Sequence, residues 1–320
     1  MRTALVLGAG GLTGQAYHLG VLTALAELAG YDGREADVVV GTSAGSLVAA
    51  GLAGGMSAQD QAASLSGDPM SEEGAGLLRA SRARAGAVRA AADAPLPAGR
   101  RPLAPGAVLA AARRPWSVRP GAVVSSLLPA GRTSTESISY GVRKLHGTGW
   151  PDGGRLRVCA VRARDARRVV FGAPGAPQTD AGSAVAASCA IPGYFAPVLI
   201  DGEHYVDGGG HSPTNADVVR HEHPDLVVVS SPMSFGPGAG RTPDAAVRFA
   251  VRRYLAREVR LLRRHGATVV VFQPTRQDLA AMGLNPMRLL RASRVVRTVA
   301  GSVRARVEAQ PRLVDMLLSG

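Results

Sequence analysis

A serine between two glycines has the residue types that nucleophilic chemistry requires. Residues 41–45 are Gly-Thr-Ser-Ala-Gly, with Ser43 at the centre. The β-branched residues 38–40 predict the end of a buried strand, and the composition of residues 47–53 predicts a helix. A serine at such a strand–turn–helix junction exposes its Oγ at a helix N-terminus, where N–H groups favour developing negative charge. Gly41 and Gly45 fit this interpretation, because a Cβ at either position would crowd the strand or the helix.

A glycine-rich loop precedes this serine. Residues 8–14 are Gly-Ala-Gly-Gly-Leu-Thr-Gly, between a predicted strand at 3–7 and a predicted helix over 16–28. A dinucleotide fingerprint would need glycine at position 13, where Thr13 stands, and an acidic residue after the second strand, whereas Asp37 precedes it. A phosphate-binding P-loop would need a lysine, which is absent here. We therefore favour an oxyanion hole, in which glycines let backbone N–H groups approach an acyl oxygen.

A carboxylate far along the chain is the third chemical feature. Asp207 follows a predicted strand at 204–206 and precedes three glycines, 208–210. A carboxylate at a strand end, followed by glycines, is well placed to reach another loop. In a parallel sheet the loops that follow the strands open at one edge, so the glycine loop and Ser43 are expected to face each other there.

Alternating strands and helices predict an α/β fold of three layers, α/β/α, around a mostly parallel sheet. Further strands are expected at 156–163, 169–171, 198–200, 225–231 and 268–272, and helices at 133–145, 181–189, 243–265 and from 285 onward. We expect one domain over 1–320, in which 242–320 supplies C-terminal helices. Residues 56–132 are rich in Ala, Arg and Pro, and form either a cap or lid with short helices at 73–92 and 106–113, or a solvated region without a role.

Composition narrows the function classes. The chain of 320 residues has a net charge of +13 and 46% hydrophobic residues. Genomic bias explains the arginine excess, and attraction to an anionic membrane surface is the functional alternative. Nucleic-acid binding is not expected, since no such motif is present and aromatic residues are only 4%. Cys159 and Cys189 have no metal-ligand spacing, and no signal peptide or membrane span is evident, so a cytoplasmic protein with peripheral membrane contact is expected.

Taken together, the glycine loop, the Ser43 turn and Asp207-Gly208-Gly209 resemble the patatin-like phospholipases. Residues 188–197 are similar to that family's Ser-x-Ala-x-Pro-x-x-Phe-x-Pro block, and Pro213 and Asn215 follow Asp207 as they do in the family. The resemblance spans roughly 3–230 and is weak between 56 and 132; residues 282–287 are also similar to some bacterial members. One departure is Thr13, where the family usually has Arg or Lys.

The resemblance implies a serine acyl hydrolase that cleaves lipid acyl esters through an acyl-serine intermediate, without a cofactor or a metal. Ser43 would be the nucleophile and Asp207 its general base. The N–H groups of Gly10, Gly11 and Leu12 would form the oxyanion hole, with help from Ala44. The motif glycines are Gly8, Gly14, Gly41, Gly45, Gly208 and Gly209.

Seven histidines raise the alternative of a Ser–His–Asp triad. None lies in a triad motif, and Ser43 follows only two predicted strands, whereas an α/β-hydrolase places its serine after several. His211, the histidine nearest to Asp207 in sequence, is the one to follow; each histidine is otherwise expected at the surface or in packing. Two other functions stay open: a non-catalytic protein that binds an anionic surface, and an acyltransferase that uses the same acyl-serine.

Overall fold

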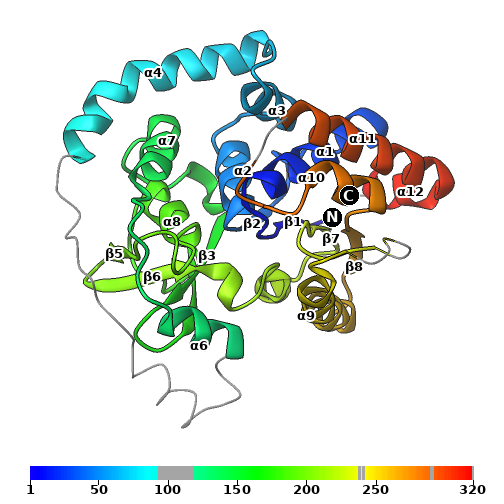
Figure 1. Ribbon diagram of the computed structural model, residues 1–320. Helices are drawn as coiled ribbons and strands as arrows, with labels where there is room; N and C mark the ends of the chain where they lie inside the picture. The colour runs from blue at the N-terminus through cyan, green and yellow to red at the C-terminus, as the bar shows by residue number, and fades with distance from the viewer. Residues whose placement is uncertain (93–118, 237–238, 240–241, 289–291, 319–320) are drawn as a thin grey trace.

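The computed structural model describes residues 1–92, 119–236, 239, 242–288 and 292–318 (Figure 1). A mixed sheet of eight strands lies at its centre. The strands are β1 (Thr3–Leu7), β2 (Val38–Thr42), β3 (Leu156–Arg162), β4 (Arg167–Phe171), β5 (Val198–Ile200), β6 (Glu203–Asp207), β7 (Leu226–Ser230) and β8 (Thr268–Phe272).

The sheet has the order β5-β6-β3-β2-β1-β7-β8, and β4 pairs with β3. Strands β3, β2, β1, β7 and β8 are parallel, whereas β4, β5 and β6 are antiparallel to their partners. Valine runs such as residues 38–40 and 227–229 are buried on both faces, as is typical of parallel strands between helical layers. The predicted fold class, with the serine turn after the second strand, is confirmed.

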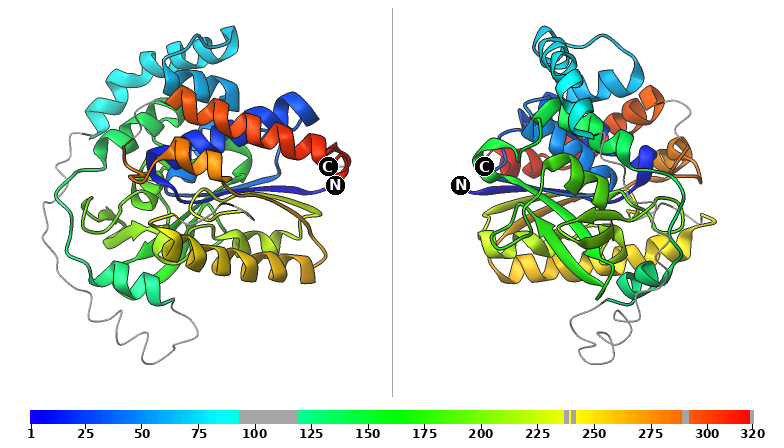
Figure 2. Two further views of the ribbon diagram at one scale, coloured as in Figure 1. Left: turned by 45° about the vertical axis from the view of Figure 1, so that its right-hand side comes forward. Right: turned by 90° about the vertical axis from the view of Figure 1, so that its left-hand side faces the viewer.

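Helices cover both faces of the sheet (Figure 2). One layer contains α1 (Gly11–Ala29), α2 (Ala44–Ala53), α3 (Ala58–Ser66), α4 (Glu72–Ala92), α7 (Glu136–His146), α8 (Ala181–Ser188), α10 (Arg276–Met282), α11 (Ala292–Ala309) and α12 (Arg312–Leu318). The other contains α6 (Pro120–Leu127) and α9 (Ala245–Arg264), with short 3-10 turns at Asp152–Gly154, Gly208–Gly210 and Ala216–Glu222 elsewhere along the chain. No described helix is long and apolar enough to cross a membrane.

The predicted cap region is only partly described. Helices α3 and α4 and the short α6 lie within 56–132, and α4 agrees with the helix expected at 73–92. The helix expected at 106–113 lies outside the described residues, so a cap or lid over 56–132 stays a prediction. The helical segment expected from residue 285 begins later, at α11, and is divided from α12 near Pro311, whose missing N–H cannot continue a helix.

The layers meet most tightly where α2 begins beside β1. A Cβ built on Gly45 would lie 2.0 Å from the carbonyl oxygen of Leu7, and one on Gly41 would lie 2.4 Å from the Cα of Ser46. Both distances are far below van der Waals contact, and the obstructing atoms belong to the backbone. The glycines at 41 and 45 are therefore required by packing.

Gly45→Ala should lower the free energy of unfolding strongly, by about 3 kcal/mol or more, because the backbone of β1 or α2 must move. Gly301→Ala in α11 is the matched control. Nothing lies within 4 Å of a Cβ there, so alanine should stabilise the protein by roughly 0.5–1 kcal/mol. Denaturant titration of the three proteins checks both signs, and equal stability of the parent and Gly45→Ala would contradict the packing requirement.

Candidate active site

Ser43 occupies a strained turn between β2 and α2. Its φ of 52° and ψ of −123° lie outside the regions that L-residues favour. The residue is buried, with 4% of its surface exposed, and its hydroxyl stands at the N-terminus of α2. This is the strand–turn–helix junction that the sequence predicts.

Two serine side chains hold the turn in place. The backbone N–H of Ser43 donates to the hydroxyl of Ser188 (2.8 Å), which itself donates to the carbonyl of Cys159 (2.6 Å). Ser46 Oγ donates to the carbonyl of Ser43 (2.6 Å). Ser188 thus ties the strained residue to β3. The sequence places Ser188 in a family-like block but gives no sign of this contact, since the partners are far apart in the chain.

Asp207 lies at the end of β6 and reaches Ser43 across the sheet. Its backbone pairs with Ala160 of β3, and β3 is the neighbour of β2. The carboxylate accepts a hydrogen bond from the N–H of Gly209 at 2.7 Å, and the Ser43 side chain lies close enough to lower the pKa of Asp207. The structure therefore brings together the two side chains that the sequence singled out.

The pKa of Asp207 is raised to about 6, because burial disfavours the charged form more than the Ser43 side chain and the Gly209 N–H favour it. The folded-state pKa lies above the unfolded value of 3.8. Protonation therefore favours folding at low pH, and this contribution is lost as the pH rises through about 6. At neutral pH the carboxylate is largely ionised, and its raised pKa suits it to take up a proton from a nearby hydroxyl.

The glycine loop lies against the start of α2, since a Cβ on Gly45 would lie 2.8 Å from the carbonyl oxygen of Gly8. Gly8 N–H donates to the carbonyl of Ser230 (3.0 Å), and Gly11 has a φ of 59°. Within the described residues, no group accepts a hydrogen bond from the N–H of Gly10, Gly11 or Leu12. Three adjacent donors beside a serine hydroxyl can bind an oxyanion. Ala44 N–H, which follows Ser43, likewise has no acceptor in that part of the chain.

Two prolines from the C-terminal third of the chain cover this loop. A Cβ on Gly10 would lie 2.7 Å from Pro232 Cγ, and one on Gly11 would lie 2.6 Å from the carbonyl oxygen of Pro286. That carbonyl also accepts from Thr13 N–H at 3.2 Å. Glycine at both positions is thus needed for close packing. The segment 282–287, in which the sequence showed only a family likeness, thus lies against the glycine loop.

His18 is a supporting residue that sequence reasoning missed. It is fully buried in α1, and Nε2 donates to the carbonyl of Gly8 (2.7 Å) while Nδ1 accepts from Ser230 Oγ (2.7 Å). Burial lowers its pKa to about 4, so the ring is neutral and its two nitrogens can divide these roles. The sequence did contain a signal for this role. A polar side chain among the apolar residues of a buried helix requires hydrogen-bond partners.

A buried polar network supports the loop after Asp207. The Asn215 side-chain amide donates to Thr42 Oγ1 (3.1 Å) and to the carbonyl of Gly208 (3.3 Å), so it joins the residue before Ser43 to the residue after Asp207. Glu258, only 2% exposed, fixes the surrounding loop. It accepts from Ser212 (2.6 Å), Thr214 (2.7 Å), the N–H of Ala216 (3.0 Å) and Arg119 (3.1 Å).

No histidine joins this pair of side chains. None of the hydrogen bonds made by the described histidine rings reaches Ser43 or Asp207. His211 is partly buried beside Arg119 and Arg168, and burial with these cations lowers its pKa to about 3. The described residues also contain no cluster of His, Cys, Asp or Glu that could hold a metal ion. Cys159 and Cys189 are buried free thiols.

Residues 5–220 match the family model described as patatin-like phospholipase. The chain belongs to this family. Members are typically lipid acyl hydrolases, and the family implies a lipid substrate. Thr13, which departs from the family's basic residue, is buried with 2% of its surface exposed.

Two solved structures are similar to this patatin-like chain over 96% of its length. VipD from Legionella pneumophila shares 15% identity with a TM-score of 0.43, and the match covers 67% of that chain. The type III effector protein ExoU shares 17% identity with a TM-score of 0.36, and the match covers 53% of that chain. None of the curated protein sequences matches significantly.

The strain at Ser43 has a measurable consequence in this patatin-like domain. Ser43→Gly should be more stable than Ser43→Ala by roughly 1 kcal/mol, because glycine tolerates a positive φ and this gain exceeds its greater freedom in the unfolded chain. Both variants lose the hydroxyl, so the difference reports the backbone alone. Thermal or denaturant unfolding of the pair measures it, and a more stable alanine variant would show that the turn is relaxed.

Proposed function

We propose that this protein is a serine acyl hydrolase that cleaves lipid acyl esters with a Ser43–Asp207 dyad. The observation that supports it most directly is the approach of the Ser43 side chain to the buried Asp207 carboxylate, together with three adjacent N–H donors of the glycine loop that have no acceptors in the described structure. Family membership supports the lipid acyl substrate.

In the proposed reaction Asp207 takes the hydroxyl proton as Ser43 Oγ attacks the acyl carbon. The carbonyl oxygen becomes an oxyanion, which the N–H groups of Gly10, Gly11 and Leu12 stabilise. Collapse of this intermediate breaks the ester bond, and the leaving alcohol takes the proton back from Asp207. Water, activated by the same carboxylate, then attacks the acyl-serine and releases the carboxylic acid and free Ser43.

Exposed apolar side chains near this edge of the sheet support a lipid substrate presented at a surface. Leu12 (39% exposed) follows the glycine loop, and Leu284 (67%) lies two residues before Pro286, which covers that loop. Tyr194 (50%) lies in the loop after Ala190, whose carbonyl accepts from Asp207 N–H (2.9 Å). Such side chains suit contact with lipid acyl chains, and the net charge of +13 favours an anionic membrane surface.

Replacement of the proposed dyad should abolish hydrolysis without unfolding the protein. Ser43→Ala and Asp207→Asn should each lower kcat/KM for a p-nitrophenyl acyl ester by about 10³-fold or more. Phospholipid vesicles with fatty acid release as the readout test the lipid substrate separately. Ser137→Ala, at an exposed position of α7, is the matched control and should keep full activity. A folded Ser43→Ala protein that hydrolyses the ester at the parent rate would refute the dyad.

The pKa of Asp207 predicts the pH dependence of this reaction. Because the base must be ionised, kcat/KM should level off above about pH 6 and fall about tenfold per unit below it. A neutral ester measured from about pH 3.5 to about pH 8 avoids titration of the substrate and includes the ordinary carboxyl range. A profile that stays flat through this range would contradict the assignment of Asp207 as the base. A midpoint near the pKa of an ordinary exposed carboxyl would also contradict it.

A further inference from the structure

The free edge of the sheet at β8 carries an unusual set of polar groups. The N–H of Thr268 and the carbonyl of Phe272 bond toward the β7 side of the sheet (2.8 and 2.9 Å). Alternate residues of a parallel strand bond to opposite sides, so Val269 and Val271 direct their N–H and C=O groups outward. Because β8 ends the strand order, these groups face no neighbouring strand.

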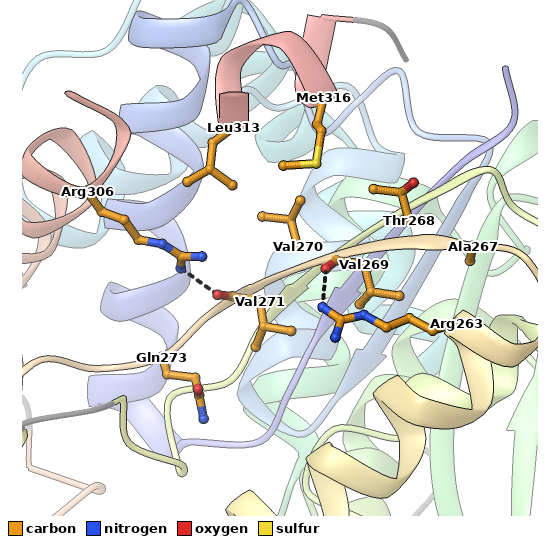
Figure 3. A pocket seen from close by; sticks show the side chains of 10 residues that line it. All are labelled: Arg263, Ala267, Thr268, Val269, Val270, Val271, Gln273, Arg306, Leu313 and Met316. Atoms are coloured by element: carbon orange, nitrogen blue, oxygen red, sulfur yellow. Dashed lines mark hydrogen bonds between the residues drawn. The ribbon is translucent and has the colours of Figure 1, made fainter. Parts of the chain in front are cut away.

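Two arginines occupy the outward carbonyls (Figure 3). Arg263 of α9 donates to the carbonyl of Val269 (3.2 Å), and Arg306 of α11 donates to that of Val271 (2.5 Å). The Arg306 guanidinium also lies over the Phe272 ring, 4.8 Å from its centroid. With both carbonyls occupied, a further strand cannot pair with this edge, and only hydrogen-bond donors are left.

The N–H of Val271 lies between those two carbonyls along the strand, and so between the two guanidinium groups. No residue in the described ranges accepts a hydrogen bond from it. An N–H flanked by two cations suits an anion, because all three groups are hydrogen-bond donors and two of them carry positive charge.

The positive charge of these arginines is not balanced within the described structure. None of the ion pairs there involves Arg263 or Arg306. Partial burial lowers the pKa of Arg306, which shows that the surroundings oppose its charge. An anion bound here would remove that penalty.

A cavity of about 590 Å³ adjoins these donors (Figure 3). Leu313 and Met316 from α12 and Val270 from β8 give it apolar lining, and Arg306 and Arg263 approach β8 from opposite sides. This volume lies within the range of small-molecule sites, about 300–1,000 Å³. The cavity therefore suits a ligand with an anionic head and an apolar body.

We propose that this cavity binds a carboxylate with an apolar body, with its head on the Val271 N–H between Arg263 and Arg306 and its chain against Leu313 and Met316. The site is separate from Ser43, because β1 and β7 lie between β2 and β8. Binding at this site does not depend on the proposed ester hydrolysis at Ser43. The carboxylic acid released in that reaction nevertheless belongs to the same class of ligand.

Octanoate binding to the full chain, measured by titration calorimetry, tests the site. Arg263→Gln and Arg306→Gln should each raise the Kd about tenfold, equivalent to about 1.4 kcal/mol. Arg260→Gln and Arg297→Gln remove the same charge from exposed positions of the same two helices and should leave the Kd unchanged. In amide NMR spectra of the parent, octanoate should shift the Val271 N–H signal. If Arg306→Gln fails to fold, octanoate binding to Arg263→Gln, a change at an exposed position, tests the site without it.

Two comparisons decide the ligand chemistry. Acetate tests the head without the chain, and octylammonium carries the same chain with the opposite charge; both should bind at least about tenfold more weakly than octanoate. The proposal is overturned if octanoate binds the Arg263→Gln variant as tightly as the parent, if octylammonium matches octanoate, or if the Val271 signal does not move at saturation.

Discussion

The site depends on the close approach of two backbones, the end of β1 and the start of α2. No side chain separates them, because a Cβ on Gly45 would lie 2.0 Å from the Leu7 carbonyl oxygen. This approach puts the glycine loop after β1 directly beside the turn after β2. Parallel pairing of the two strands fixes their register, with Leu7 opposite Gly41. The N–H groups of the loop and the Ser43 hydroxyl are thereby placed on rigid elements, as a preorganised site requires.

A second constraint is the cost of a buried carboxylate. Asp207 is held in an environment that raises its pKa to about 6, and only two donors, Ser43 and Gly209, offset that burial. Two neighbouring carboxylates have more partners than Asp207. Glu258 accepts four hydrogen bonds, and Asp217 forms an ion pair with Arg168 at 2.6 Å. Well-satisfied carboxylates hold the loop, and the under-satisfied one faces the serine. The proposed role of Asp207 as a base depends on this difference, because a fully stabilised carboxylate would have little affinity for a proton.

Local sequence patterns predicted the fold class and the elements that carry the candidate site residues. The valine runs, the glycine-flanked serine and the Asp-Gly-Gly strand end each state a local requirement, so β1, β2, β6 and the Ser43 turn could be located from composition and spacing alone. The roles of His18, Ser188, Asn215 and Glu258 could not, because each acts through a partner distant in sequence. Ser188 reaches Cys159 and Ser43, and Glu258 in α9 organises residues 212–216. Pro286 closes on Gly11 from beyond the region that matches the family model, and its contact follows only from the packing of the C-terminal helices.

The arginine excess illustrates why composition alone was ambiguous. A net charge of +13 suggests a basic surface, yet several arginines serve the interior of the fold. Arg168 and Arg119 pair with the buried carboxylates of Asp217 and Glu258 beside the loop that follows Asp207. Arg263 and Arg306 instead bond to backbone carbonyls at the edge of the sheet, and no described carboxylate pairs with them. The first pair has its charge satisfied by the protein and therefore supports structure. The charge of the second pair is not matched by a described carboxylate, and for that reason we place the proposed anion site at the edge of β8.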